Sequence, residues 1–359
     1  MKSIKAIDLF SGSGGTTQGL KKSGIKVVAA VEIDDVACKT YKYNNPEVKL
    51  FNKDIRKITK SDFSNLYNKK NDYLMLVACP PCQGFSSIRL GGEDDIRNEL
   101  VFEYQRLIEE LNPDFLIMEN VAGMTGRKGE KIFDAFKTEV TKKYHLVYDV
   151  LNAADYGVPQ TRKRLVVHGI KKSLYKNLKL TEFTLPAKTH SKEGLDGLSK
   201  WKNADVILDL PPINAGESYE GEKEVYNHVA NGLSEINISR IQLIREGGGS
   251  RNVLPEHLVL ECHKNTKGHS DVYGILDLNK PAITITGGCM TFSKGRFGHP
   301  YQDRAISARE AARLQSFDDG YVFFGNRGQL AKQIGNAVPV RLAESSGNYF
   351  MNLIQRDGL

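Results

Sequence analysis

The chain has 359 residues, of which 40% are apolar and 26% are charged. This length leaves room for a buried core in two domains, or in one large domain with an insertion. The composition is close to that of ordinary soluble proteins, which excludes collagen, coiled coils, disulfide-rich scaffolds and wholesale disorder. The net charge of +7 permits a polyanionic partner without requiring one.

At the start of the sequence, Lys5 and Asp8 interrupt the apolar run, which predicts neither a signal peptide nor a membrane span. We therefore expect a cytoplasmic protein that does not enter a membrane. The cysteines are odd in number and scattered, so a disulfide framework is not expected and a special cysteine would be a nucleophile or a ligand. They are Cys38, Cys79, Cys82, Cys262 and Cys289.

The first 170 residues alternate short β-branched runs with polar, helix-like stretches. This alternation predicts βαβ units, and hence an α/β fold with a parallel sheet covered on both faces. Ligands of such a sheet bind at the carboxyl ends of its strands. The predicted strands are residues 4–10, 26–32, 48–54, 73–79, 115–121 and 164–170.

The regular pattern fades after about residue 185, where prolines, an acidic stretch at 217–224 and the triple glycine at 247–249 predict irregular or β-rich structure. A helical pattern resumes at 308–314 and again at 340–354. We therefore predict a second domain in the middle of the chain and a return to the first domain at its end. The predicted boundaries are 1–185 for the first domain, 186–305 for the second and 306–359 for the return.

The first predicted strand leads into the sequence DLFSGSGG at residues 8–15, and the second ends at Glu32. A glycine turn lets a cofactor approach the backbone, and an acid that closes the next strand can accept both hydroxyls of a ribose. Thr17 replaces the third glycine of the dinucleotide fingerprint, so a pyrophosphate loop is incomplete. S-adenosylmethionine, which has a ribose and an adenine but no phosphate, fits the shorter turn. A tight turn without a ligand is the alternative.

The sequence CPPCQGFSS follows the fourth predicted strand at residues 79–87. Cys79 and Cys82 have the spacing of a thiol redox pair or of half a zinc site. However, no second pair with metal spacing occurs, and glutamine and glycine after two prolines are typical of a mobile loop, so we expect no metal. The remaining alternatives are a buried structural thiol, favoured for Cys79, and a nucleophilic thiolate, favoured for Cys82.

Two polar groups complete the candidate site. Residues 119–121 read ENV and end the fifth predicted strand, which places Glu119 beside the cysteine loop as a structural cap or as a general acid. Residues 160–164 read QTRKR and lead into a strand. Alternation along a strand puts Gln160, Arg162 and Arg164 on one face, although a solvated basic face is the usual explanation of such a run.

Taken in order, these segments resemble the motifs of the DNA (cytosine-5) methyltransferases. Small departures at residues 77–79, Asp318 and Val340 remove no reacting group. The resemblance implies the Rossmann-like fold of S-adenosylmethionine-dependent methyltransferases, with a mostly parallel sheet and a smaller, irregular or β-rich target-recognition domain. The matching segments are 8–15, 80–87, 119–121, 160–164, REAARLQSF at 309–317 and QIGNAVP at 333–339.

The resemblance assigns the attack on carbon 6 of cytosine to Cys82, because carbon 5 becomes nucleophilic only after a thiolate adds to the ring. Cationic groups help to keep a thiol ionised. Arg162 and Arg164 are the candidates, one stabilising the thiolate and the other holding the base. Glu119 would hydrogen-bond ring nitrogen 3 and the exocyclic amine. The base that removes the carbon 5 proton is not identified.

The resemblance also implies S-adenosylmethionine as the cofactor. Glu32 would hold the ribose hydroxyls and Asp54 the adenine amine, with Ile33 and Ile55 on either side of the ring. The other implied cofactor residues are Phe10, Gly12, Gly14, Pro80, Leu100 and Asn336.

The implied partner is double-stranded DNA, from which the target cytosine must be flipped out because its reacting atoms are inaccessible in a duplex. The loop at 83–87 would close behind the flipped base, and residues 186–305 would read the sequence. A companion restriction endonuclease would act on the same site without forming a stable complex. The predicted DNA contacts are Gln83, Ser86, Ser87, Gln160, Arg240, Arg245, Arg251, Lys294 and Arg296.

Two alternatives stay open at this point. An RNA (tRNA) cytosine-5 methyltransferase would use the same cysteine and glutamate, although the cysteine loop of those relatives usually departs from the sequence QGFS that is kept here. A nucleotide-dependent thiol oxidoreductase would use the glycine turn and the Cys79–Cys82 pair. It leaves Glu119, Asn336 and the segment 160–164 unexplained.

Overall fold

The computed structural model describes residues 2–81, 99–127, 129–221, 225–264 and 271–355. It divides into two compact units, and the chain passes between them more than once. The sequence predicted that the chain returns to the first domain at residue 306. In this division, residues 306–337 belong to unit 2, and the chain returns to unit 1 at Val338. Unit 1 comprises Met1–Tyr156, Lys163–Thr189 and Val338–Leu359, and unit 2 comprises Gly157–Arg162 and His190–Ala337.

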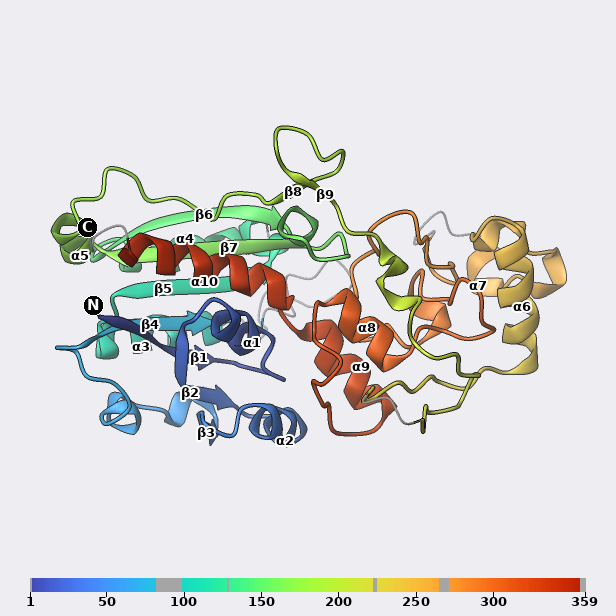
Figure 1. The fold of residues 1–359 in the computed structure, drawn as a ribbon, viewed down its shortest axis with the longest axis horizontal. Coiled ribbons are helices and arrows are strands. Elements are labelled where there is room, and N and C mark those ends of the chain that lie inside the picture. The colour runs from blue at the N-terminus through green and yellow to red at the C-terminus, as the bar shows by residue number, and fades with distance from the viewer. Residues whose placement is uncertain (1, 82–98, 128, 222–224, 265–270, 356–359) are drawn as a thin grey trace. The chain divides into compact units, whose positions relative to one another are not determined.

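Unit 1 is built on a seven-stranded sheet with the order β3-β2-β1-β4-β5-β7-β6 (Figure 1). The five strands from β3 to β5 run parallel, whereas β7 is antiparallel to both β5 and β6. The strand order reverses between β1 and β4, and this switch point is where ligands of such sheets bind. The strands are β1 (Ser3–Leu9), β2 (Lys26–Glu32), β3 (Lys49–Asn52), β4 (Asp72–Ala78), β5 (Phe115–Val121), β6 (Tyr144–Asn152) and β7 (Lys163–Lys171).

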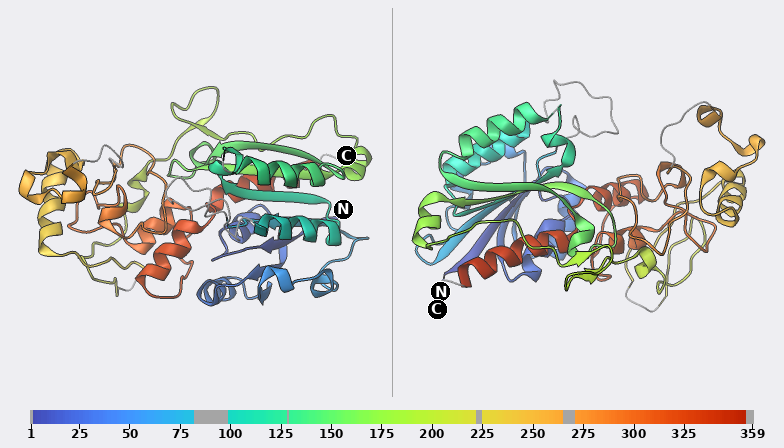
Figure 2. Two further views of the ribbon diagram at one scale, coloured as in Figure 1. Left: turned by 180° about the vertical axis from the view of Figure 1, so that it is seen from behind. Right: turned by 90° about the horizontal axis from the view of Figure 1, so that it is seen from above.

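Helices cover both faces of this sheet, as the predicted α/β fold requires (Figure 2). Side chains along β4 alternate between the faces, so Leu74 and Leu76 join one hydrophobic cluster while Met75 and Val77 join the other. Helices α3 (Leu100–Leu111) and α4 (Glu130–Val140) pack on the first cluster. The helices on the second are α1 (Gly15–Lys22), α2 (Asp35–Asn44), α5 (Lys172–Asn177) and α10 (Val340–Gln355).

Strand β6 is absent from the predicted set, whereas the six predicted strands are all present within one to two residues at their ends. It is an edge strand that pairs only with β7 among the described strands. His145, Asp149 and Asn152 interrupt its apolar pattern, and most of its side chains are partly or fully exposed. Its formation therefore depends on pairing with β7, which a local pattern does not report.

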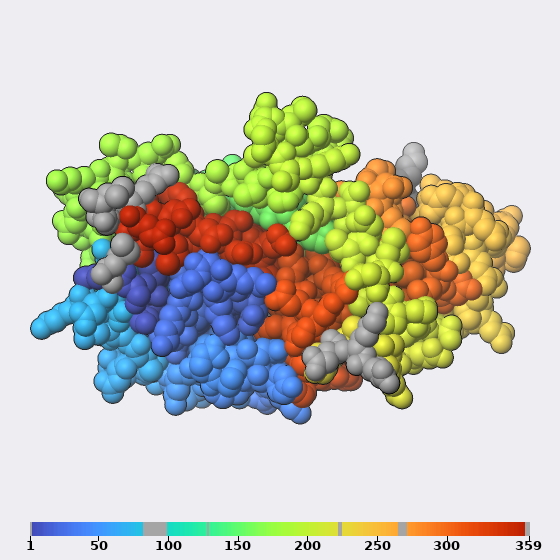
Figure 3. Space-filling model, in the orientation of Figure 1, coloured from blue at the N-terminus to red at the C-terminus, as the bar shows by residue number. Residues whose placement is uncertain are grey.

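Helix α10 lies against α1 on one face of unit 1, where Figure 3 shows their surfaces in contact. Gly19 permits this close approach, because a Cβ there would meet the Val340 carbonyl oxygen at 2.4 Å. Gly347 of α10 permits a similar close approach to Ser23, because a Cβ at Gly347 would lie 2.1 Å from the Ser23 Oγ.

Neither α10 nor any other helix in the described part of the chain is long and apolar enough to cross a membrane.

Unit 2 consists mostly of short helices and loops. Its described regular β structure is the two-residue pair β8 (His190–Ser191) and β9 (Ser199–Lys200), so the irregular alternative of the prediction holds and the β-rich one does not. A buried ion pair joins Arg304 to Glu310, with N to O distances of 2.6 and 2.7 Å. The helices are α6 (Glu235–Glu246), α7 (Glu261–Lys264), α8 (Ala308–Leu314) and α9 (Arg327–Asn336).

Candidate active site

The glycine turn after β1 is an unusual stretch of backbone. Phe10, Gly12 and Gly14 have φ values of 57°, 53° and 96°, in the left-handed region. Glycine adopts this region freely, but a phenylalanine there is strained, and such strain is concentrated at functional sites. A Cβ at Gly12 would meet no atom within 4 Å, so the turn faces open space at this point.

Glu32 at the end of β2 holds this turn in place. One carboxylate oxygen accepts a hydrogen bond from the Gly12 amide at 2.8 Å. The other accepts from the amides of Ile33 and Asp34, at 2.9 and 2.8 Å. The carboxylate therefore links the ends of the two neighbouring strands and keeps the turn open beside β2.

The predicted adenine residues follow the ends of β2 and β3 and lie in different surroundings. Ile33 is 64% exposed, whereas Ile55 is buried in the hydrophobic cluster on the α3 face, against which Phe10 and Leu100 also pack. The Arg56 side chain hydrogen-bonds the Asp54 carboxylate and lowers the pKa of Asp54 below its ordinary value. The structure thus brings Phe10, Ile55 and Leu100 to one cluster and leaves Ile33 facing solvent.

Beneath the turn lies a buried polar network that the sequence reasoning missed. Asp8 is fully buried and accepts a hydrogen bond from the Thr17 hydroxyl at 2.7 Å, and Thr17 also bonds the Tyr41 hydroxyl at 2.7 Å. Burial raises the pKa of the Asp8 carboxyl to about 7, the hydrogen bond from Thr17 opposes this rise, and the charge of Glu32 adds to it. The signal in the sequence was Asp8 itself, an acidic residue between the apolar residues Ile7 and Leu9 of β1.

The free energy of unfolding is expected to fall as the pH rises from about 4 to about 7, because the folded state holds the Asp8 proton more tightly than the unfolded chain does. The loss attributable to Asp8 is up to about 4 kcal/mol. Asp8→Asn keeps an oxygen that accepts from Thr17 but cannot ionise, so it should lack this component. Urea unfolding of both proteins at about pH 5 and about pH 8 measures the difference. An equal fall in the variant would assign the pH dependence to other groups.

The ends of β4 and β5 are tied to each other just before the cysteine loop. The Asn120 side chain donates a hydrogen bond to the Pro80 carbonyl at 3.1 Å, and its own oxygen accepts from the Val121 amide at 2.8 Å. The Cys79 amide donates to the Leu9 carbonyl at 3.3 Å, which connects the same loop to β1. The start of the loop is therefore fixed to both neighbouring strands. Cys82, Gln83, Ser86 and Ser87 lie outside the described residues.

Glu119 and Arg164 form an ion pair at the same edge of the sheet, a contact that the sequence analysis did not predict. The Arg164 Nε lies 2.9 Å from Glu119 Oε1, and the two side chains are only 15% and 13% exposed. Strands β5 and β7 are neighbours in the sheet, so the pair connects positions that are far apart in the chain. A mostly buried guanidinium in this position orients the carboxylate and supplies positive charge beside it.

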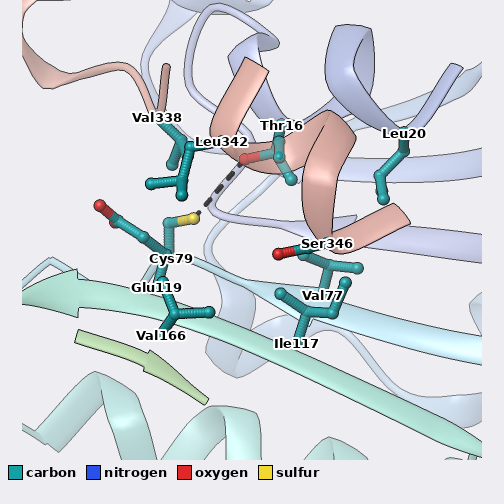
Figure 4. Close-up of a pocket in the computed structure, with 11 residues that line it drawn as sticks. Thr16, Leu20, Val77, Cys79, Ile117, Glu119, Val166, Val338, Leu342 and Ser346 are labelled. Carbon is teal, nitrogen blue, oxygen red and sulfur yellow. Dashed lines mark hydrogen bonds between the residues drawn. The ribbon is translucent and has the colours of Figure 1, made fainter. Parts of the chain in front are cut away.

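A small cavity of about 20 Å³ is lined by Glu119, by Cys79 and by residues of β4, β5, β7, α1 and α10 (Figure 4). That is room for about one water molecule. The Cys79 sulfur points toward the Thr16 hydroxyl, 3.7 Å away. Burial, and then the charges of Glu119 and Asp8, raise the pKa of Cys79 well above its ordinary value. Cys79 therefore stays a thiol, as expected of a structural cysteine rather than a nucleophile.

Gln160 and Arg162 belong to unit 2, where their side chains are buried and bound to the chain itself. Gln160 accepts from the Ile285 amide at 2.9 Å and donates to the Leu314 carbonyl at 2.8 Å. Arg162 donates to the carbonyls of Ile285 and Gly335, at 2.7 and 3.0 Å. The predicted DNA contact of Gln160 would require its amide to leave these partners. Only Arg164, of the two predicted catalytic arginines, lies with Glu119 in unit 1.

Asn336 also belongs to unit 2, at the end of α9, so its predicted place beside the cofactor turn of unit 1 stays a prediction. Of the predicted DNA contacts in unit 2, Lys294 is exposed, whereas Arg245 pairs with Asp303 at 2.8 Å. Arg296 donates to the Gly249 carbonyl at 3.1 Å. These two arginines therefore also support the fold of unit 2.

The sheet order, with a glycine turn and a polar cluster at its switch point, defines the fold of an S-adenosylmethionine-dependent methyltransferase. The chain belongs to the C-5 cytosine-specific DNA methylase family, whose model matches residues 4–351. The protein is therefore a DNA (cytosine-5) methyltransferase, and this assignment is favoured over the RNA methyltransferase and the thiol oxidoreductase.

Known proteins similar to this chain support the same family. It is 38% identical over 344 residues to the type II methylase M.HgiDII of Herpetosiphon aurantiacus, covering 94% of this chain and 92% of that protein. It is 33% identical over 355 residues to the type II methyltransferase M1.HphI of Haemophilus parahaemolyticus, covering 96% and 85%. A crystal structure of a prophage-encoded E. coli protein, described as a DNA modification methyltransferase, matches with a TM-score of 0.72 at 26% identity, covering 98% and 100%.

Proposed function

We propose that the protein transfers a methyl group from S-adenosylmethionine to carbon 5 of a cytosine flipped out of a specific duplex sequence, through a covalent adduct between Cys82 and carbon 6. The observation that supports this most is the geometry around the start of the cysteine loop. The Asn120 amide holds the Pro80 carbonyl, and Glu119 is paired with Arg164 on the adjacent strand ends. A nucleophile loop and an oriented carboxylate at one sheet edge suit addition to a pyrimidine ring.

In this mechanism the Cys82 thiolate donates an electron pair to carbon 6, and the ring electrons move toward carbon 5 and nitrogen 3. Glu119 hydrogen-bonds nitrogen 3 and the exocyclic amine, which stabilises the charge that develops there. Arg164 keeps the Glu119 carboxyl in place. Carbon 5 would then take the methyl group, with the new carbon–carbon bond forming as the sulfur–methyl bond breaks and a neutral thioether leaving. Loss of the carbon 5 proton to a base expels Cys82 as a thiolate and restores the aromatic ring.

The residues after β1 and β2 fit the proposed cofactor. Gly12 faces open space, Glu32 stands at the end of the neighbouring strand, and Ile33 presents an exposed apolar surface. When bound, S-adenosylmethionine supplies an electrophilic methyl group on a sulfonium. Glu32 would hold the ribose, Asp54 the adenine amine and Ile33 the face of the adenine ring, with Phe10, Gly14, Pro80, Leu100 and Asn336 completing the site.

Glu32→Gln is expected to weaken S-adenosylmethionine binding by roughly tenfold or more, because an amide replaces one of the two oxygens that organise the turn and bind the ribose. Equilibrium dialysis with labelled cofactor, in the absence of DNA, measures the change. Glu47→Gln, which removes a carboxylate that pairs with Lys21 outside the turn, is the matched control. Unchanged affinity in Glu32→Gln would remove Glu32 from the proposed cofactor site.

We further propose that duplex DNA is the partner and that most of unit 2 reads its sequence, with the catalytic groups in unit 1. A companion endonuclease would recognise the same sequence as a separate protein, and the enzyme would act in the cytoplasm, associated with the nucleoid through DNA. The type II names of the similar methylases support this restriction-modification role. Lys294 is the exposed predicted base or phosphate contact in this unit.

Exchange of residues 190–303 for the corresponding segment of a methylase with another target is expected to change the methylated sequence while preserving the reaction. Placing the junction before Arg304 keeps its buried ion pair with Glu310. Because each mismatched base pair costs about 1 to 3 kcal/mol, preference for the parental site should fall by on the order of 10²-fold or more. Bisulfite sequencing of treated DNA reads out the result. An active chimera that still methylated the parental site would place specificity outside residues 190–303, in unit 1 or in the retained residues 157–162 and 304–337 of unit 2.

The proposed activity is tested by incubating the purified protein with labelled S-adenosylmethionine and either duplex DNA or tRNA. We expect label in DNA, located by bisulfite sequencing at cytosines in one short sequence. Label in tRNA alone would instead support the RNA alternative. Nicotinamide or flavin absorbance in the purified protein would support the thiol oxidoreductase.

A further inference from the structure

Unit 2 contains a cavity of about 130 Å³ lined by residues of α6, of α7 and of the segments near them, far along the chain from the glycine turn and the cysteine loop. Helices α6 and α7 are labelled in Figure 1. Aliphatic residues of segment 254–260 form part of its wall. Among the described residues that line it, none is acidic. Its polar lining consists of Arg240, Arg251, Asn252, His263 and Tyr273.

Arg240 is a buried cation in the wall of this cavity. It is only 6% exposed, and its Nε donates to the Leu258 carbonyl at 2.9 Å while its NH1 donates to the Asn237 side chain at 2.9 Å. No carboxylate among the described residues pairs with it. Buried guanidinium groups are nearly always paired with an anion, because removal of a charge from water is unfavourable. The missing counter-charge points to an anionic ligand.

The other polar residues make the cavity electropositive and hold it in shape. Arg251 contributes a second guanidinium. Burial, and then the charges of Arg251 and Arg240, lower the pKa of His263 below its ordinary value. The Tyr273 ring lies 5.8 Å from the Arg240 guanidinium and packs on Phe292, and Tyr273 has a φ of 59°. A tyrosine in this strained conformation at a ligand-sized cavity agrees with a preorganised binding site.

We propose that this cavity binds a phosphate group, held by the guanidinium groups of Arg240 and Arg251 and by the side chain of Asn252. Planar guanidinium groups suit phosphate oxygens in particular. Because the proposed substrate of this unit is DNA, the phosphate is a backbone phosphodiester of the duplex. The source of the phosphate therefore rests on the proposed function, whereas the site itself does not.

The first test uses neither DNA nor cofactor, so its outcome is independent of methyl transfer. Phosphorus NMR line widths of inorganic phosphate and of dimethyl phosphate are titrated with the protein at constant ionic strength. Both probes should bind the parent, and Arg251→Gln should bind them roughly tenfold more weakly or worse. Lys280→Gln removes an exposed cation of the same unit that does not line the cavity, and it should bind like the parent.

Arg240→Met supplies a second variant with similar side-chain length and no charge. It should also lose both probes, and its melting temperature shows whether unit 2 still folds. The proposed site would be overturned if a folded Arg240→Met or Arg251→Gln bound both probes as tightly as the parent. It would also be overturned if the parent bound neither probe, or if Lys280→Gln lost as much affinity for the probes as the cavity variants.

The second test asks whether DNA is the source of the phosphate. An unlabelled duplex should displace dimethyl phosphate from the parent. In Arg251→Gln, the plot of log affinity for duplex DNA against log salt concentration should flatten by about 0.9, the value for one lost phosphate contact. Binding of inorganic phosphate without binding of dimethyl phosphate, or no displacement by the duplex, would overturn the assignment to DNA.

Discussion

Cys82→Ala is expected to abolish methyl transfer, whereas Cys79→Ala should retain most of it. Only the thiol in the loop is proposed to attack carbon 6. The Cys79 sulfur lies in a water-sized cavity beside Thr16, and burial holds its pKa well above the ordinary value, so it supplies almost no thiolate near neutral pH. Removal of the nucleophile eliminates the adduct on which activation of carbon 5 depends. The expected loss for Cys82→Ala is at least on the order of 10⁴-fold.

The adduct itself provides the measurement. Duplex DNA that carries 5-fluorocytosine at the target has no removable proton at carbon 5, so the enzyme should remain covalently attached after methyl transfer. A shifted band on a denaturing gel is expected for the parent and for Cys79→Ala, and none for Cys82→Ala. Attachment through Cys79, identified by peptide mapping, would reverse the assignment of the two cysteines.

Glu119→Gln is expected to slow the chemical step by on the order of 10²-fold or more, while DNA binding changes little, because a positioned acid typically contributes that much. In this structure the Arg164 Nε lies 2.9 Å from Glu119 Oε1 and fixes the carboxylate at the end of β5. The amide has the same shape but cannot ionise or carry the acid's proton. Stabilisation of the charge that develops at ring nitrogen 3 would therefore weaken.

Single-turnover rates at saturating DNA and cofactor separate this effect from binding. Glu130→Gln is the control, because Glu130 is an exposed carboxylate at the first residue of α4, and its replacement should leave the rate unchanged. If Glu119→Gln retained the parental single-turnover rate but melted at a lower temperature, Glu119 would be a structural cap.

The fold was largely predictable because its information is local. Strands β2 and β5 match their predicted ranges exactly as residues 26–32 and 115–121, since buried strands of a covered sheet are nearly continuous apolar runs. The antiparallel direction of β7 was not predictable from such runs. It depends on β6 and β7 pairing with each other, and β6 is an exposed edge strand with an interrupted pattern.

For the candidate site, the sequence indicates residue types but not the contacts that the structure shows between them. The motif order led to Glu119 and Arg164, and the structure places them in an ion pair. The hydrogen bond from Asn120 to the Pro80 carbonyl and the network beneath Asp8 join segments distant in sequence, so no local pattern reports them. Gln160 shows the converse, because its position beside two arginines suggested a surface, whereas its partners Ile285 and Leu314 come from a later part of the chain.

The packing of α10 on α1 determines when this enzyme becomes complete during its synthesis. Domains generally fold as units while the ribosome is still working. Helix α1 is made early, but its packing partner α10 begins only at residue 340. Gly19 and Leu20 of α1 are buried in the finished protein, where α10 packs on the same side of the sheet. A nascent chain that already carries the cysteine loop therefore lacks the helix that covers part of this face of the sheet. Unit 1 is therefore complete only after residues 340–355 have been made, when most of unit 2 has also been made.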